Sequence, residues 1–208
     1  MRRLCKPVLS PISGDTFTVK TAAASFYQTL RELTETILYT DSGEDALDLP
    51  SGIARGAELL CASTKSGGKL MFIGNGASAA IASHMATDFW KTGGMRAMAF
   101  NDIAGLTCIG NDYGYAHLFE KPVEMFADPG DVLVAISSSG RSENILLAAK
   151  AAKAKGARVL TLSGFEPGNP LRALGDGNFY VPVQAYGPVE VLHHSICHCL
   201  LDTIVNCR

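Results

Sequence analysis

The chain has 208 residues, 47% of them hydrophobic, which suits one domain with a substantial core. Its formal net charge is −2, so the chain as a whole has no electrostatic attraction for nucleic acid or for an anionic membrane surface. No apolar stretch approaches the roughly 20 residues that span a bilayer. We therefore expect neither a nucleic acid nor a membrane as a partner.

The N-terminal region predicts a tail followed by a single domain. Residues 1–18 contain prolines and a glycine without hydrophobic periodicity, so we expect a loose tail there and one domain over 19–208. Apolar residues recur at helical spacing from Val19 to Tyr39, and a second helix is expected from Ile53 to Ser66. We expect both helices to pack on the domain or on a partner subunit.

Beyond residue 68, short apolar runs alternate with helical patterns. Strands are predicted at 69–74, 96–100, 131–137, 158–163 and 178–183. Helices are predicted near 78–91, 115–126, 144–155 and 189–205. Apolar strands that alternate with helices indicate a parallel sheet covered on both faces. The expected fold class is therefore α/β, a three-layer sandwich with a five-stranded, parallel, Rossmann-like sheet.

A serine-rich loop separates the third of these strands from the helix that follows it. Residues 135–146 read AISSSGRSENIL, with the loop running from Ser137 to Ser142. Ligands of parallel sheets bind beyond the carboxyl ends of the strands, and a helix N-terminus favours an anion. A serine could simply cap the helix, but a cap needs only one hydroxyl. The loop therefore predicts a phosphate monoester site.

The loop after the first strand supports a competing interpretation. Residues 74–79, GNGASA, fit the glycine pattern of dinucleotide-binding loops, and Asp102 follows the second strand, where an acid would contact a ribose. A nicotinamide-dependent oxidoreductase is therefore one alternative. It does not account for the serine loop, nor for the histidines described next.

Histidines and carboxylates recur at intervals of four on two predicted helices. His84 and Asp88 share one helix face, and Glu190, His194 and His198 share another. This is the spacing of metal ligands on helices, although a single pair at this spacing is weak evidence and a core histidine is the ordinary alternative. His193 also lies close to Glu190, so the sequence leaves open whether His193 or His194 joins a metal site.

Together these segments resemble the SIS (sugar isomerase) domain family, and within it the phosphoheptose isomerases. The resemblance is carried by GNGASAAIASHMATD (74–88), GDVLVAISSSGRSENIL (130–146) and VEVLHHSICHCL (189–200), with further matching stretches at 99–119 and 154–164. It implies the isomerisation of a ketose phosphate to an aldose phosphate. The expected substrate is sedoheptulose 7-phosphate, and the expected product is D-glycero-D-manno-heptose 7-phosphate. The resemblance also implies that the protein is a homotetramer.

The resemblance also implies roles for individual residues. The substrate- and phosphate-binding positions it assigns are Asn75, Ser78, Asp102, Ser137, Ser138, Ser139 and Ser142. The metal ligands it assigns, with Zn²⁺ as the expected ion, are His84, Asp88, Glu190 and His198. The catalytic groups it assigns are Asp88, Glu190 and His198.

Two of these positions depart from the family pattern. Asp88 stands where the family has a glutamate that acts as general base, and Glu190 stands where the family has a glutamine. Either carboxylate could therefore be the base. We favour Asp88, because it holds the family's catalytic position.

One alternative within the same family is a non-catalytic, phosphosugar-binding adaptor of the DnaA initiator-associating type. Such adaptors lack the acid and the terminal histidine of the site, whereas this chain has Asp88 and His198. The six cysteines form no C-x-x-C pair and no export signal is evident, so we expect reduced thiols and a cytoplasmic location.

Overall fold

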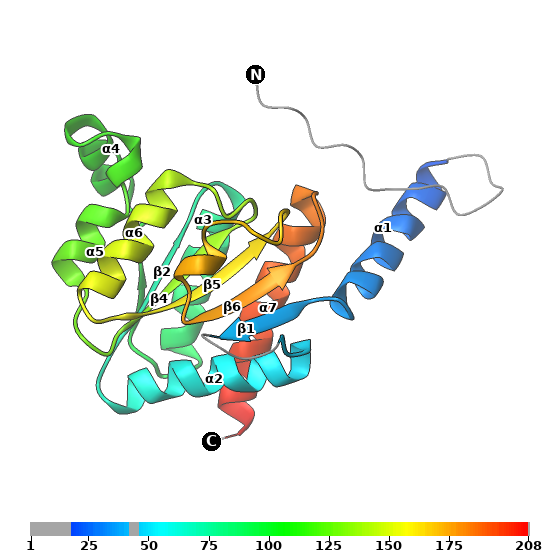
Figure 1. The fold of residues 1–208 in the computed structure, drawn as a ribbon, viewed down its shortest axis with the longest axis horizontal. Helices are drawn as coiled ribbons and strands as arrows, with labels where there is room; N and C mark the ends of the chain where they lie inside the picture. The colour runs from blue at the N-terminus through cyan, green and yellow to red at the C-terminus, as the bar shows by residue number, and fades with distance from the viewer. Residues whose placement is uncertain (1–17, 42–45, 208) are drawn as a thin grey trace.

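The structure, a computed structural model, describes residues 18–41 and 46–207 (Figure 1). The predicted tail, residues 1–18, lies outside this part except for Thr18, which caps the first helix. The prediction of a single domain over 19–208 stays a prediction.

The α-helices are α1 (Val19–Thr34), α2 (Leu49–Lys65), α3 (Ala77–Lys91), α4 (Ile103–Asp112), α5 (Glu120–Phe126), α6 (Glu143–Ala154) and α7 (Tyr186–Asn206). Short 3₁₀ helices occur at η1 (Tyr115–His117) and η2 (Arg172–Leu174).

One mixed sheet forms the centre of the fold, in the order β1-β6-β5-β4-β2-β3. The strands are β1 (Leu38–Asp41), β2 (Leu70–Gly74), β3 (Ala97–Ala99), β4 (Val132–Ser137), β5 (Arg158–Gly164) and β6 (Gly177–Val181). Strands β2 to β6, which are the five predicted ones, run parallel to one another. Every residue of β2, β4 and β6 is buried, which confirms that both faces of the sheet are covered.

The helices form two outer layers, as predicted. Alternate residues of β4 point to opposite faces: Val132 and Val134 join a core beneath α2, α3 and α7, whereas Leu133 and Ala135 join a core beneath α5 and α6. The three-layer α/β sandwich is therefore confirmed (Figure 1).

A sixth strand was not predicted. The helix expected from Val19 to Tyr39 ends at Thr34, and the chain then forms β1, which pairs antiparallel with β6. Ile37 and Tyr39 are buried while Leu38 is exposed, which is the alternation of a strand. The spacing of Ile37 and Leu38 also fits a helical stripe, and this ambiguity explains the wrong helix boundary.

Helix α4 was also missed. None of its residues is fully buried, only Leu106 and Ile109 pack partly against the core, and its two glycines weaken the helical pattern in the sequence. The helix predicted near 115–126 is divided into η1 and α5.

The two N-terminal helices differ in how they meet the domain. Helix α2 lies against α7 and adds Ile53 and Leu60 to the core. Helix α1 extends away from the body of the domain (Figure 1), and only its last turns, through Leu30 and Leu33, pack against the core. Within the described residues, no helix combines the length and the apolar character needed to cross a membrane.

The unpredicted strand should make a large contribution to stability through Tyr39. This side chain is 1% exposed, and its ring packs edge-on against Phe179 with centroids 4.9 Å apart. We expect Tyr39→Ala to lower the free energy of unfolding by about 3–5 kcal/mol, as for other buried aromatic truncations. Chemical denaturation measures this. The matched change Tyr113→Ala, at a residue 58% exposed, should cost about 0.5 kcal/mol or less. Equal losses would show that β1 is not anchored as described.

Candidate functional site

The serine loop follows β4 at the carboxyl edge of the sheet. Ser137 and Ser138 are buried, and the chain turns at Gly140, where φ is +61°. A Cβ at Gly140 would lie 2.0 Å from Oδ1 of Asn169, so only glycine fits this turn. Ser142 occupies the N-cap position of α6, but its side chain makes no capping hydrogen bond. The capping interpretation therefore does not explain Ser142, whose hydroxyl remains available to a ligand.

The loop after β2 lies beside the serine loop and is hydrogen-bonded to it. The amides of Asn75 and Asn144 exchange two hydrogen bonds, each of 2.9 Å. The hydroxyl of Tyr115 donates to Oδ1 of Asn75 over 3.0 Å. Asn144 is almost fully buried, so this pairing satisfies its amide and holds the two loops together.

A cavity of about 740 Å³ opens between these loops. Six of the seven predicted substrate-binding residues line it: Asn75, Ser78, Ser137, Ser138, Ser139 and Ser142. The seventh, Asp102, is not among the lining residues, and its carboxylate accepts a hydrogen bond from the backbone N–H of Gly105 as the N-cap of α4. The cavity therefore has the hydroxyl and amide donors that a phosphate requires.

Four further residues with polar side chains line this cavity that the sequence interpretation did not assign to it: Tyr115, Glu143, Asn144 and Tyr186. Glu143 and Asn144 directly follow the serine loop, and this adjacency was the available signal. No sequence signal marked the two tyrosines, because each comes from a distant segment.

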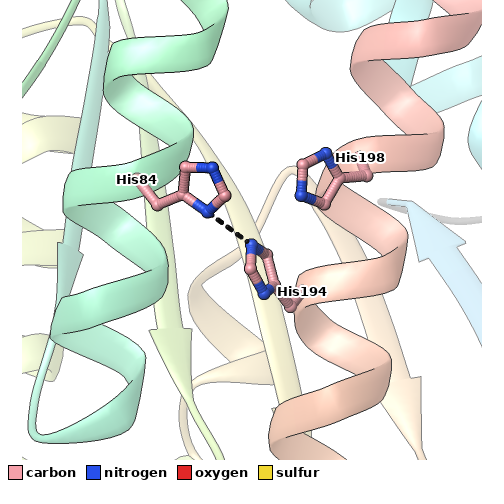
Figure 2. Close-up of side chains that lie close together, drawn as sticks. All are labelled: His84, His194 and His198. Carbon is pink, nitrogen blue, oxygen red and sulfur yellow. Dashed lines mark hydrogen bonds between the residues drawn. The ribbon is translucent and has the colours of Figure 1, made fainter.

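Three imidazole rings meet between α3 and α7 (Figure 2). Nδ1 of His84 lies 3.0 Å from Nε2 of His194, and the potential ligand nitrogens of His84, His194 and His198 all lie within 4.8 Å of one another. On the other side of its ring, Nε2 of His84 lies 3.2 Å from Oδ2 of Asp88. The structure thus brings together His84, Asp88 and His198 from the predicted ligand set, and adds His194.

Glu190 connects the histidine cluster with the serine loop. It lines the large cavity and also a second cavity of about 330 Å³, which His194 and His198 line. Burial raises the pKa of the Glu190 carboxyl above its usual value. A carboxylate with a raised pKa, placed between the serine-loop cavity and the histidine cluster, is suited to transferring protons.

The adjacent histidines, His193 and His194, have different surroundings. His193 is fully buried, and its Nε2 donates to the backbone oxygen of Ser163 over 3.1 Å. The pKa of His194 is lowered by burial first, then by His198 and His84, while Asp88 acts in the opposite direction. His194 faces the cluster, and His193 is a core residue. Of the two histidines that the sequence left open, His194 is therefore the one that belongs to the cluster.

Comparison with known proteins agrees with this architecture. The family model of the SIS domain matches residues 26–164. The chain is 39% identical to the phosphoheptose isomerase of Helicobacter hepaticus over 183 residues, covering 85% of this chain and 92% of that protein. It is 38% identical to the phosphoheptose isomerase of Thiobacillus denitrificans over 169 residues, covering 77% and 86%.

A solved structure gives the same result. The phosphoheptose isomerase of Neisseria gonorrhoeae superposes with a TM-score of 0.80 at 31% identity, over 91% of this chain and all of that chain. The chain therefore belongs to the SIS domain family. Within that family it is similar, over most of its length, to the phosphoheptose isomerases.

Burial of His193 should make the stability of the protein depend on pH. Burial lowers the pKa of this imidazole from its ordinary value of 6.5 to about 4. Between these values the unfolded chain binds a proton that the folded chain does not, so stability is lost as the pH falls. We expect His193 to account for a loss of about 2 kcal/mol between about pH 7 and pH 5.

The variant His193→Gln tests this prediction, because glutamine can still donate to Ser163 but does not titrate. Urea denaturation at both pH values should show that the free energy of unfolding changes less with pH in the variant than in the unmodified protein. The same slope in both proteins would mean that His193 is not kept neutral by burial.

Proposed function

We propose that the protein is a phosphoheptose isomerase that interconverts sedoheptulose 7-phosphate and D-glycero-D-manno-heptose 7-phosphate. The similarity to proteins of that name over most of the chain supports this proposal. The observation that carries it is the placement of Glu190, which lines both the serine-loop cavity and the cavity of the histidine cluster. One sugar phosphate could therefore reach both.

The serine loop is assigned the phosphate. Ser137, Ser139 and Ser142 can each donate a hydroxyl, and the backbone at the start of α6 adds N–H donors and the positive end of the helix dipole. Ser138 belongs to the same loop, while Asn75 and Ser78 donate from the opposite side of the cavity. Asp102, as the cap of α4, is proposed as a substrate contact only on the strength of the family resemblance.

The reaction requires a proton to leave C1 of the ketose and a proton to arrive at C2. Removal of the C1 proton leaves its electron pair to form the C1=C2 bond of the enediol, while the C2 carbonyl oxygen takes up a proton. Protonation at C2 and loss of the proton from the C1 hydroxyl then give the aldose. We assign this transfer to Glu190, because it lies at the cavity where the sugar would bind, with His198 beside it. Asp88, which its family position favoured as the base, lies with Oδ2 3.2 Å from Nε2 of His84 and does not line the large cavity.

A divalent metal, for which we propose zinc, fits the residues between α3 and α7. The family's ligand positions correspond to His84, Asp88, Glu190 and His198, and three imidazole groups lie within reach of a single ion. Imidazole nitrogens and carboxylates are the usual zinc ligands. When bound, zinc would polarise the carbonyl of the sugar.

The two alternative functions are less well supported. A non-catalytic adaptor would not need Glu190 at the serine-loop cavity, nor Asp88 and His198 at the neighbouring histidine cluster. A nicotinamide enzyme would need an acid facing the ribose, whereas the Asp102 carboxylate caps α4. We therefore favour the isomerase over both.

We also propose a homotetramer in the cytoplasm. Helix α1 extends from the domain and exposes the apolar side chains of Val19 and Tyr27, which suits packing against another subunit. Cys61, Cys108, Cys197, Cys199 and Cys207 are free thiols, as expected in a reducing compartment.

Incubation with sedoheptulose 7-phosphate in D₂O tests the proposed function. We expect solvent deuterium to enter the sugar at the exchanging carbon and the aldose 7-phosphate to form. Unphosphorylated sedoheptulose should react at least about 100-fold less efficiently, because the serine loop would have no phosphate to bind. If both sugars react alike, or neither exchanges, the proposal fails.

The identity of the base can be tested with two carboxylate variants. Glu190→Gln should lower the exchange rate by about 10²- to 10⁴-fold at saturating zinc, because general-base catalysis typically contributes this much. Glu58→Gln, at an exposed residue of α2, is the control and should retain full activity. If Asp88→Asn abolishes exchange with metal retained while Glu190→Gln stays active, Asp88 is the base instead.

A further inference from the structure

We infer that His84, His194 and His198 are the metal ligands of this protein, and that Asp88 orients His84 instead of binding the ion. His194 replaces Glu190 in this set, and Glu190 faces the sugar. The inference rests on the proposed function only in assuming that a metal belongs to this site.

The first support is the position of the three rings. His84 projects from α3, and His194 and His198 project from successive turns of α7, so that the rings face one another (Figure 2). Zn–N bonds of 2.0–2.1 Å in a tetrahedral site place neighbouring ligand nitrogens about 3.3 Å apart. The 3.0 Å between Nδ1 of His84 and Nε2 of His194 is close to this value.

The second support is the use of both nitrogens of His84. Its Nδ1 faces His194, whereas its Nε2 lies 3.2 Å from the Asp88 carboxylate. If Nε2–H donates to Asp88, the lone pair of Nδ1 points toward the cluster. Histidine ligands of metals are commonly held in this way by a carboxylate that does not itself bind the ion. Asp88 is therefore assigned as a positioning residue.

The third support is that hydrogen bonds alone do not account for the orientations of all three rings. The contact between His84 and His194 can be one hydrogen bond, in which only one of the two nitrogens supplies a proton. In the described part of the chain, no side chain is hydrogen-bonded to the His198 ring, although it lies 4.7 Å from the ring of His194 between centroids. An ion shared by the three lone pairs accounts for all three orientations.

The consequence concerns Glu190, one helical turn before His194. Three imidazole ligands match the number that catalytic zinc sites take from the protein, with one position left open. Glu190 is then not needed as a ligand. Its carboxylate remains at the cavity that contains the serine loop, where the proposed base is required.

Zinc titration in competition with a chromophoric chelator tests the inference without reference to isomerase activity. His194→Ala should weaken zinc binding by more than about 100-fold, and Asp88→Asn by about 10- to 100-fold, as for other residues that orient a ligand. Glu190→Gln should change the affinity by less than about threefold. His117→Ala is the control, because His117 pairs with Glu120 outside the cluster, and it should also leave the affinity unchanged.

Unfolding curves for each variant establish that a loss of zinc is not a loss of fold. The inference is wrong if His194→Ala binds zinc as tightly as the unmodified protein, if Glu190→Gln loses it, or if the unmodified protein binds none. Failure of the proposed function would look different: zinc affinities would follow the expected order while sedoheptulose 7-phosphate stayed unchanged.

Discussion

The parallel pairing of β2 with β4 determines where the site can form. Gly74 and Ile136 are opposite each other in this pair, so the loop after β2 and the serine loop after β4 emerge side by side at one edge of the sheet. In the strand order, β3 lies to one side of β2 and β5 lies to the other side of β4, so the chain crosses over in opposite directions from this pair. Such a switch point leaves a crevice at the carboxyl ends of the strands. The reciprocal hydrogen bonds of Asn75 and Asn144 join the two loops across it.

Helix α7 lines the other side of the crevice. It packs against α3, with Leu192 and Ile196 buried in the core and His194 and His198 beside His84 of α3. Glu190, His194 and His198 follow at intervals of four residues and therefore form one row. The row begins at the serine-loop cavity and ends at the histidine cluster, so a single helix links the two.

Much of this could be predicted from local sequence. The strong apolar runs identified all five parallel strands, and the serines identified the loop whose residues line the cavity.

Strand β1 was missed because Ile37 and Leu38 fit a helical stripe as well as a strand. Helix α4 was missed because it is short, contains two glycines and buries only Leu106 and Ile109 in part. The predictions that could not be made from the sequence depend on contacts between distant segments. Tyr115 meets Asn75 across 40 positions, and His194 meets His84 across 110. Spacing on α7 alone could not distinguish His193 from His194, because adjacent helical residues differ by only about 100° in direction. Only the packing of α7 buries one and turns the other toward α3.

The central claim is that one sugar phosphate binds with its phosphate on the serine loop and its carbonyl end at Glu190 and the histidine cluster. A crystal structure of the zinc-loaded Glu190→Gln variant with sedoheptulose 7-phosphate tests it most directly. The account predicts phosphate oxygens hydrogen-bonded to Ser137, Ser139 and Ser142, with C1 and C2 beside residue 190. A phosphate bound elsewhere, or a sugar chain directed away from α7, would contradict it.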